Sequence, residues 1–173
     1  MHTGKLEVLA NAATILVSLL LSAVLVKVFL LPQPVAHPSG PAFRVARGTN
    51  IRSTLPGVDW AKNGRTLVLA VSTRCHLCSE SAPFFRRITQ ERPKDVRLVA
   101  VLPQPVSDAR KYLEEEGVLV DDVRQAPLSS IGVTGTPTLL LVDRDGTVGD
   151  VWTGKLPEDG ERQVLAALRS KRS

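Results

Sequence analysis

The sequence predicts an α/β domain with a mixed sheet, preceded by one transmembrane helix. Near-continuous apolar runs occupy residues 66–72, 96–102 and 138–142, with helical patterns between them. Runs of this kind are typical of strands buried on both faces, and their alternation with helices is typical of α/β folds. The third run continues through the turn Asp143-Arg-Asp-Gly146 into residues 147–152, which predicts a closing β-hairpin.

The segment before the domain is apolar. Residues 8–26 contain no charge, and after Lys27 the apolar run continues to Leu31. A helix needs about 20 apolar residues to cross a bilayer, and a lysine near its end can extend to the headgroups. The run exceeds the roughly 7–15 residues of a signal-peptide core, and no Ala-x-Ala cleavage site follows it. We therefore predict a short tail at 1–7 and a retained transmembrane anchor at 8–31.

Residues 32–42 are rich in proline and predict an extended, semi-rigid linker, followed by one domain at 43–173. The net charge of +5 comes from scattered basic residues rather than from a cluster, so no nucleic-acid partner is predicted. The positive-inside rule favours a cytoplasmic C-terminal domain. Lys5 is the basic residue before the anchor, whereas Lys27, Arg44 and Arg47 lie at its end or beyond it. That rule weakens when a long folded domain follows the anchor.

The remaining elements follow from caps and periodicity. Residues 43–46 alternate and predict a short edge strand, and the cysteine segment opens a helix through about residue 90. Ser107 or Asp108 can cap a helix that ends at Gly117. A final helix is expected to have Pro157 in its first turn and to pack through Val164, Leu165 and Leu168.

The two cysteines of the chain, Cys75 and Cys78, stand at the expected helix start directly after a strand. Free N–H groups at a helix N-terminus stabilise an anion, which lowers the pKa of a thiol from about 8.5. Cys75 is therefore predicted to be the nucleophilic thiolate and Cys78 the residue that resolves a mixed disulfide. Arg74 and His76 flank Cys75 and are candidates for tuning its pKa.

Other uses of this cysteine pair compete with the redox one. Zinc is disfavoured because a structural site needs four ligands and only His76 lies nearby, so neither a metal nor another cofactor is predicted. Copper(I) accepts fewer soft ligands, so a copper-binding assembly factor stays an alternative, as does a thiol peroxidase. A purely structural disulfide across one helical turn would remove little chain entropy. A non-catalytic interaction domain would not need the cysteines.

Residues 66–168 resemble the thioredoxin superfamily, especially its membrane-anchored, extracytoplasmic thiol-disulfide oxidoreductases. The resemblance rests on Cys75-x-x-Cys78 after a buried strand, on Pro83 five residues later, and on the segment Ile131–Val142. It implies a thioredoxin-like fold and a redox-active Cys75–Cys78 disulfide.

The same resemblance implies a cis Thr136–Pro137 bond beside the cysteines and substrate binding by Gly135, Thr136, Pro137 and Gly154. It also implies thiol- or disulfide-containing protein substrates and a membrane or extracytoplasmic redox partner. We therefore expect a single-pass protein of the cell membrane with its C-terminal domain on the extracytoplasmic (periplasmic) side, in spite of the charge count.

The sequence departs from the thioredoxin pattern in three places. Arg74 stands where thioredoxin has a tryptophan, and His76-Leu77 replaces its Gly-Pro. Leu69 occupies the position of a buried aspartate that helps proton transfer at the resolving cysteine, and Glu80 is the nearest carboxylate in sequence. The direction of electron flow does not follow from these residues.

Overall fold

The computed structural model describes residues 14–18, 20–22, 44–62 and 64–170. The chain divides into two units, Met1–Ala42 and Phe43–Ser173. The predicted tail (1–7) and linker (32–42) lie outside the described residues. So does most of the predicted anchor (8–31), of which residues 14–18 and 20–22 are helical. None of the helices within the described ranges is long and apolar enough to span a membrane.

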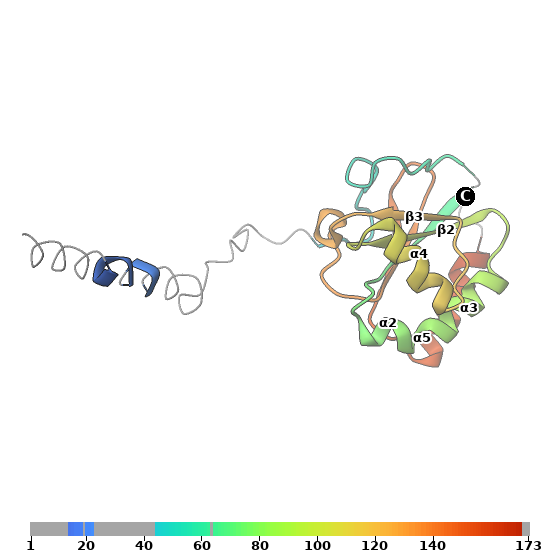
Figure 1. Ribbon diagram of the computed structural model, residues 1–173. Helices are drawn as coiled ribbons and strands as arrows, with labels where there is room; N and C mark the ends of the chain where they lie inside the picture. The colour runs from blue at the N-terminus through green and yellow to red at the C-terminus, as the bar shows by residue number, and fades with distance from the viewer. Residues whose placement is uncertain (1–13, 19, 23–43, 63, 171–173) are drawn as a thin grey trace, which may run out of the picture. The chain divides into compact units, whose positions relative to one another are not determined.

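The second unit is built on a five-stranded mixed sheet in the order β3-β2-β1-β4-β5 (Figure 1). Strands β1, β2 and β3 pair in parallel, whereas β4 is antiparallel to both β1 and β5. The strands are β1 (Arg65–Ala70), β2 (Val96–Leu102), β3 (Asp122–Gln125), β4 (Thr138–Val142) and β5 (Val148–Thr153). The predicted mixed sheet and closing hairpin are confirmed, and the three apolar runs form its three inner strands.

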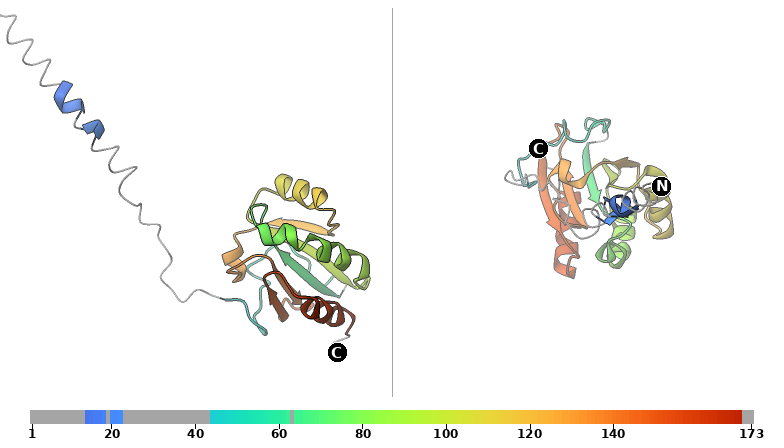
Figure 2. Two further views of the ribbon diagram at one scale, coloured as in Figure 1. Left: turned by 90° about the horizontal axis from the view of Figure 1, so that it is seen from below. Right: turned by 60° about the vertical axis from the view of Figure 1, so that its left-hand side comes forward.

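The helices pack on one face of this sheet. Connections from β1 to β2 and from β2 to β3 progress in the same direction across it, and right-handed crossovers then place their helices on the same side. The helices are α2 (His76–Glu80), α3 (Ala82–Glu91), α4 (Val106–Glu115) and α5 (Glu158–Arg169) (Figures 1 and 2). One core cluster joins them to the sheet through residues such as Phe84, Ile88, Leu113 and Leu165, together with Cys78.

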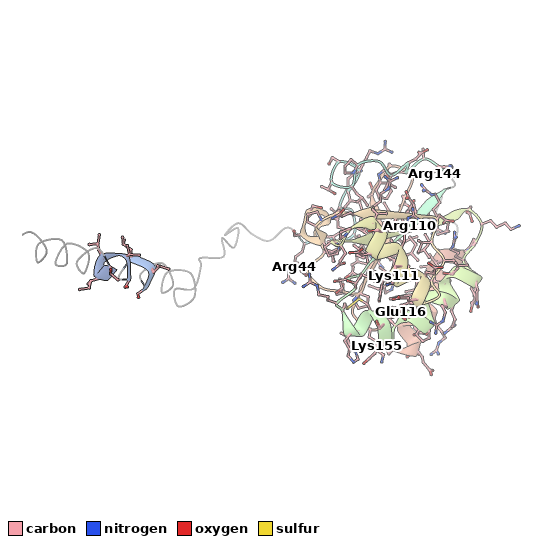
Figure 3. The ribbon with its side chains drawn as sticks, in the orientation of Figure 1. Arg44, Arg110, Lys111, Glu116, Arg144 and Lys155 are labelled. Atoms are coloured by element: carbon pink, nitrogen blue, oxygen red, sulfur yellow. A yellow bond between two sulfur atoms is a disulfide. The ribbon has the colours of Figure 1, made fainter. Side chains whose placement is uncertain are left out.

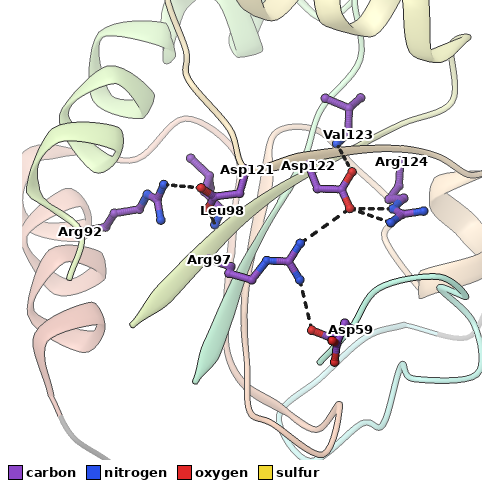
Figure 4. Close-up of polar contacts among 8 residues, drawn as sticks. All are labelled: Asp59, Arg92, Arg97, Leu98, Asp121, Asp122, Val123 and Arg124. Atoms are coloured by element: carbon purple, nitrogen blue, oxygen red, sulfur yellow. Dashed lines mark hydrogen bonds and ion pairs between the residues drawn. The ribbon is translucent and has the colours of Figure 1, made fainter. Parts of the chain in front are cut away.

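Irregular segments cover the opposite face. Ile51, Leu55 and Trp60, all at most 3% exposed, pack there with Ile131 of a short 3₁₀ helix, η1 (Leu128–Ile131). Arg97 on β2 donates to the carbonyl oxygen of Asp59 and faces Asp122, which also pairs with Arg124 (Figure 4). These contacts attach the irregular segment to strand β3.

The chain enters the domain through a segment that we call the N-terminal strap, residues 44–52. The edge strand predicted at 43–46 is wrong for the described residues 44–46, which are not in a strand. The pairing begins later: Gly48 N–H donates to the Val148 carbonyl at 2.8 Å, and Val148 N–H donates to that of Thr49 at 2.8 Å. Gly48 has φ of +85°, and this turn moves the contact with β5 beyond the alternating residues.

The helix boundaries differ from the predicted ones at prolines. The helix expected through residue 90 is divided at Ser81, because Pro83 has no N–H and lies in the first turn of α3. Helix α4 starts after Pro105 without a side-chain cap, so neither Ser107 nor Asp108 caps it. Pro157 precedes α5 as its N-cap instead of lying in its first turn.

Candidate active site

The cysteine pair lies at the N-terminus of α2, where the chain leaves β1. Cys75 is the N-cap residue and forms a disulfide with Cys78. The backbone N–H of Cys78 points at the sulfur of Cys75, with 3.2 Å between N and Sγ. Cys78 is fully buried, whereas Cys75 is partly exposed. An incoming sulfur atom can therefore reach Cys75 and not Cys78.

The loop before β4 lies directly beside Cys75. The Thr136–Pro137 bond is cis, as the resemblance implied, and the carbonyl oxygen of Thr136 is 3.4 Å from Cys75 Sγ. In the disulfide form, Cys75 Sγ carries no hydrogen, so this is a contact and not a hydrogen bond. In the dithiol form, the Cys75 S–H can donate to the Thr136 carbonyl oxygen. Pro137 is buried, and Gly135 accepts a hydrogen bond of 2.7 Å from the Thr138 hydroxyl.

Gly154 joins this loop from the end of β5. Its N–H donates to the Pro137 carbonyl at 2.7 Å, and its φ of +83° favours glycine. Apart from its two chain neighbours, no atom of the described residues lies within 4 Å of where a Cβ would stand, so the backbone here is open to an approaching chain. The four residues predicted to bind substrate thus lie together next to Cys75, and their role stays a prediction.

Glu80 contacts two basic side chains at the border of the same site. His76 Nε2 is 2.7 Å from one carboxylate oxygen of Glu80, and Lys155 Nζ is 2.6 Å from the other. The hydrogen bond from Lys155 holds the pKa of Glu80 below its usual 4.5, with smaller contributions from the charges of Lys155 and His76. His76 is therefore directed at Glu80, while Arg74 is exposed and has no ion pair among the described residues.

Lys155 was not indicated by the sequence (labelled in Figure 3). It contacts Glu80, 75 positions earlier in the chain, and its one signal in the sequence was its place directly after Gly154. Beside this ion pair lies a small depression next to Pro137. It is lined by Phe84, Phe85, Leu139 and Leu156, with Glu80, Lys155 and Glu161 among its other residues.

The environment of Cys78 is aliphatic on its inner side. Leu69 is 1% exposed and lies between Ala100 and Leu139 in the sheet register, in the same core cluster as Cys78. The position that holds an aspartate in thioredoxin therefore presents no carboxyl group here. Within the described residues, no three His, Cys, Asp or Glu side chains gather closely enough to hold a metal ion.

Comparison with known proteins agrees with this geometry. The model of the redoxin family matches residues 39–168. None of the curated proteins compared with the chain matches it.

Solved structures share the fold. A Chlorobium tepidum protein described as a thiol:disulfide interchange protein DsbE is 26% identical, with a TM-score of 0.51, over 72% of this chain and 99% of its own. A thiol-disulfide isomerase from Corynebacterium glutamicum is 15% identical, with a TM-score of 0.54, over 78% and 99%. The thioredoxin domain of a Bacteroides vulgatus thiol-disulfide oxidoreductase is 17% identical, with a TM-score of 0.53, over 73% and 99%.

The last two structures, at their low identities, show the fold alone, while the family match spans the whole sheet and the cysteine pair. A disulfide of Cys-x-x-Cys spacing at a helix N-terminus, beside a cis-proline, is the feature on which the family match and the geometry agree. The chain belongs to the redoxin family and is a thioredoxin-like oxidoreductase.

Proposed function

We propose that this protein is a membrane-tethered thiol-disulfide oxidoreductase that exchanges disulfides with protein substrates through Cys75 and Cys78. One observation carries the proposal: the exposed sulfur of the pair, Cys75 Sγ, lies 3.4 Å from the Thr136 carbonyl beside a cis-proline. A substrate chain that pairs with the Thr136 backbone would bring its own sulfur to Cys75. The name of the Chlorobium relative describes the same kind of reaction for that protein.

The reaction has two exchange steps. The Cys75 thiolate attacks a substrate disulfide, a Cys75–substrate disulfide forms, and the other substrate sulfur leaves as a thiolate. Cys78 then loses its proton and attacks Cys75 Sγ, which releases the second substrate thiolate and forms the Cys75–Cys78 disulfide. The substrate gains two electrons and the protein loses two. The reverse sequence oxidises a substrate dithiol.

Burial explains the division of labour between the two cysteines. Cys78 is 0% exposed, so the sulfur atom that it can attack is the neighbouring Cys75 Sγ of the mixed disulfide. The Cys78 N–H, 3.2 Å from Cys75 Sγ, is placed to stabilise negative charge on the nucleophile. Arg74 is the exposed cation next in sequence and adds to this in a way that salt weakens.

The proposal also places the domain on the extracytoplasmic (periplasmic) side, held by residues 8–31 and served by a membrane or extracytoplasmic redox partner. It is supported by the uncharged run 8–26 and by the resemblance of residues 66–168 to membrane-anchored, extracytoplasmic thiol-disulfide oxidoreductases.

A trapping experiment tests the chemistry. In the full-length Cys78→Ser variant the second exchange step is blocked, so substrates should accumulate as mixed disulfides on Cys75, where mass spectrometry can identify them. The matched Cys75→Ser variant keeps one thiol but should trap nothing, because Cys78 is buried. Equal trapping by the two variants, or none by either, would reject the proposed exchange. In that event, peroxide consumption or stoichiometric copper(I) binding would support one of the alternatives.

A second experiment tests the location separately. Alkaline phosphatase fused after Ser173 should be active, because it folds only outside the cytoplasm, and a fluorescent reporter that needs the cytoplasm should be dark. The opposite pattern would move the domain to the cytoplasmic side and leave the exchange chemistry to be judged by trapping alone.

A further inference from the structure

The turn after β2 contacts the loop that leads into Cys75. Strand β2 ends at Leu102, and Pro103-Gln104-Pro105 connects it to α4. The side-chain amide of Gln104, which is partly buried, spans to the loop after β1. Its Oε1 accepts from the Thr73 N–H at 3.4 Å, and its Nε2 donates to the Ser72 hydroxyl oxygen at 3.0 Å.

The amide continues the pairing of two strands where the backbone cannot. The β1–β2 ladder runs on to a hydrogen bond of 3.1 Å from Val71 N–H to the Val101 carbonyl. Beyond this point Pro103 and Pro105 have no N–H, and each fixes its own φ and restricts the residue before it. Gln104 is thus presented from a stiff turn, and its side chain supplies both an acceptor and a donor to the loop.

The contacts of Gln104 lead in two steps to the nucleophile. The Ser72 carbonyl accepts from the Cys75 N–H at 3.1 Å, and the Ser72 hydroxyl accepts from the Arg74 N–H at 3.4 Å. The residue that Gln104 holds is therefore the one that holds the Cys75 backbone. The Cys75 sulfur must in turn stay close to the Cys78 N–H for its thiolate to be stabilised.

We propose that Gln104 is a positioning residue for thiol-disulfide exchange, which keeps the loop 72–74 fixed so that the Cys75 thiolate faces the N-terminus of α2. The inference rests on the proposed role of Cys75 as the nucleophile. Without the amide, loop conformers that move the sulfur away from the helix become populated. The amide makes two hydrogen bonds, and the loss of each, at about 1 kcal/mol, corresponds to roughly a fivefold change in the ratio of such conformers to the native one.

The test uses the full-length chain, purified in detergent, in the Cys78→Ser background, where Cys75 is the single thiol. The thiolate is titrated by its ultraviolet absorbance, and the rate of alkylation by iodoacetamide is measured at neutral pH. Gln104→Ala, which removes both hydrogen bonds of the amide, should raise the pKa of the Cys75 thiol and slow alkylation severalfold, by up to about fivefold for each hydrogen bond lost. Ser72→Ala removes the hydroxyl, and with it the contacts to Gln104 and to the Arg74 N–H, but leaves the Thr73 contact; it should change both quantities in the same direction.

Gln125→Ala is the matched control. Gln125 is an exposed glutamine on β3 whose Nε2 reaches the Pro103 carbonyl at 3.4 Å, so it touches the same turn but not the loop. It should leave both the titration and the alkylation rate unchanged. If Gln104→Ala fails to fold, Ser72→Ala carries the test by itself.

The outcomes are distinct. A Gln104→Ala protein with lower unfolding free energy but an unchanged thiol titration would show a merely structural role and overturn the inference, while trapping through Cys75 would still support the exchange reaction. A background protein in which Cys75 neither titrates as an accessible thiol nor traps substrates would overturn both.

Discussion

Replacing Leu69 with aspartate tests how dry the surroundings of Cys78 are. Leu69 is 1% exposed and shares a core cluster with Cys78 and Leu139. Truncating such a residue costs roughly 2–5 kcal/mol, and a buried carboxyl group without a partner costs about 1–3 kcal/mol more. The sum is a large part of a typical stability of about 5–15 kcal/mol. Leu69→Asn, whose new side chain has nearly the shape of aspartate, should cost a similar amount under acidic conditions.

The two variants should separate as the pH rises. In Leu69→Asp, burial raises the pKa of the introduced carboxyl group in the folded state, so between the unfolded-state pKa of about 3.9 and the folded one only the unfolded chain releases its proton. Stability then falls by about 1.4 kcal/mol per pH unit in this window, which amounts to about 3 kcal/mol near pH 6. Leu69→Asn has no such group and should show no added slope.

Urea unfolding of the oxidised full-length proteins, followed by tryptophan fluorescence at several pH values, measures this difference. Parallel pH profiles for the aspartate and asparagine variants would mean that the carboxyl group reaches water, and they would refute the dry setting of Cys78. If the pH profiles show that the introduced carboxyl group is shielded from water, and the aspartate variant also resolves mixed disulfides faster than the asparagine variant, a buried acid at position 69 can assist the proton transfer at Cys78. Leu69 cannot do so.

Further changes test the ion pair at Glu80, the glycines beside Cys75 and the packing of the strap. Lys155→Ala should raise the pKa of Glu80. Because that pKa is depressed in the folded protein, Glu80 contributes stability above about pH 4.5, and this contribution is lost on acidification. The unfolding free energy of the variant should therefore fall less steeply as the pH is lowered. Gly154→Ala should lower the unfolding free energy by about 1–2 kcal/mol through its positive φ alone, whereas Gly135→Ala, without positive φ, should cost less; equal costs would contradict this. Ile51→Ala should cost roughly 2–5 kcal/mol in urea unfolding if the strap packs as described, and a neutral result would contradict that packing.

The inner strands were predictable because each is a continuous apolar run, whereas β3 was not. Its sequence, Asp-Val-Arg-Gln, has one buried side chain, Val123, and its charges are used in the pairs between Asp122, Arg97 and Arg124. Polar edge strands carry no periodic signal. The edge strand expected at 43–46 lies too early in the chain because the pairing of the strap depends on Val148, which is remote in sequence.

For the site, local spacing was enough to find the cysteines, and the resemblance supplied the cis-proline loop. The residues that support them were not found, because their contacts are remote in sequence. Gln104 meets Ser72 from 32 positions away, and Lys155 meets Glu80 from 75. In the sequence, a glutamine between two prolines and a lysine after a glycine are ordinary loop residues. Only the fold brings Gln104 to the loop after β1 and Lys155 to α2.

In the proposed exchange, the charged groups around the pair act on the Cys75 thiolate. Glu80 is on the short helix that Cys75 caps, and as a bare carboxylate it would oppose a thiolate there, but Lys155 and His76 pair with it. The helix N-terminus and Arg74 then favour the thiolate of Cys75, which stabilises the dithiol relative to the disulfide and makes the disulfide a better oxidant.

Cys78 contributes in another way. In the proposed exchange, Cys78 must lose a proton to resolve the mixed disulfide after Cys75 has attacked a substrate. In the reverse reaction, Cys78 leaves as a thiolate when a substrate thiolate attacks Cys75. Both directions therefore pass through a Cys78 thiolate in the same aliphatic setting, beside Leu69. A missing acid at that position raises the barrier equally for the forward and the reverse reaction. Position 69 thus affects the rate of exchange, and the groups around Cys75 affect its equilibrium.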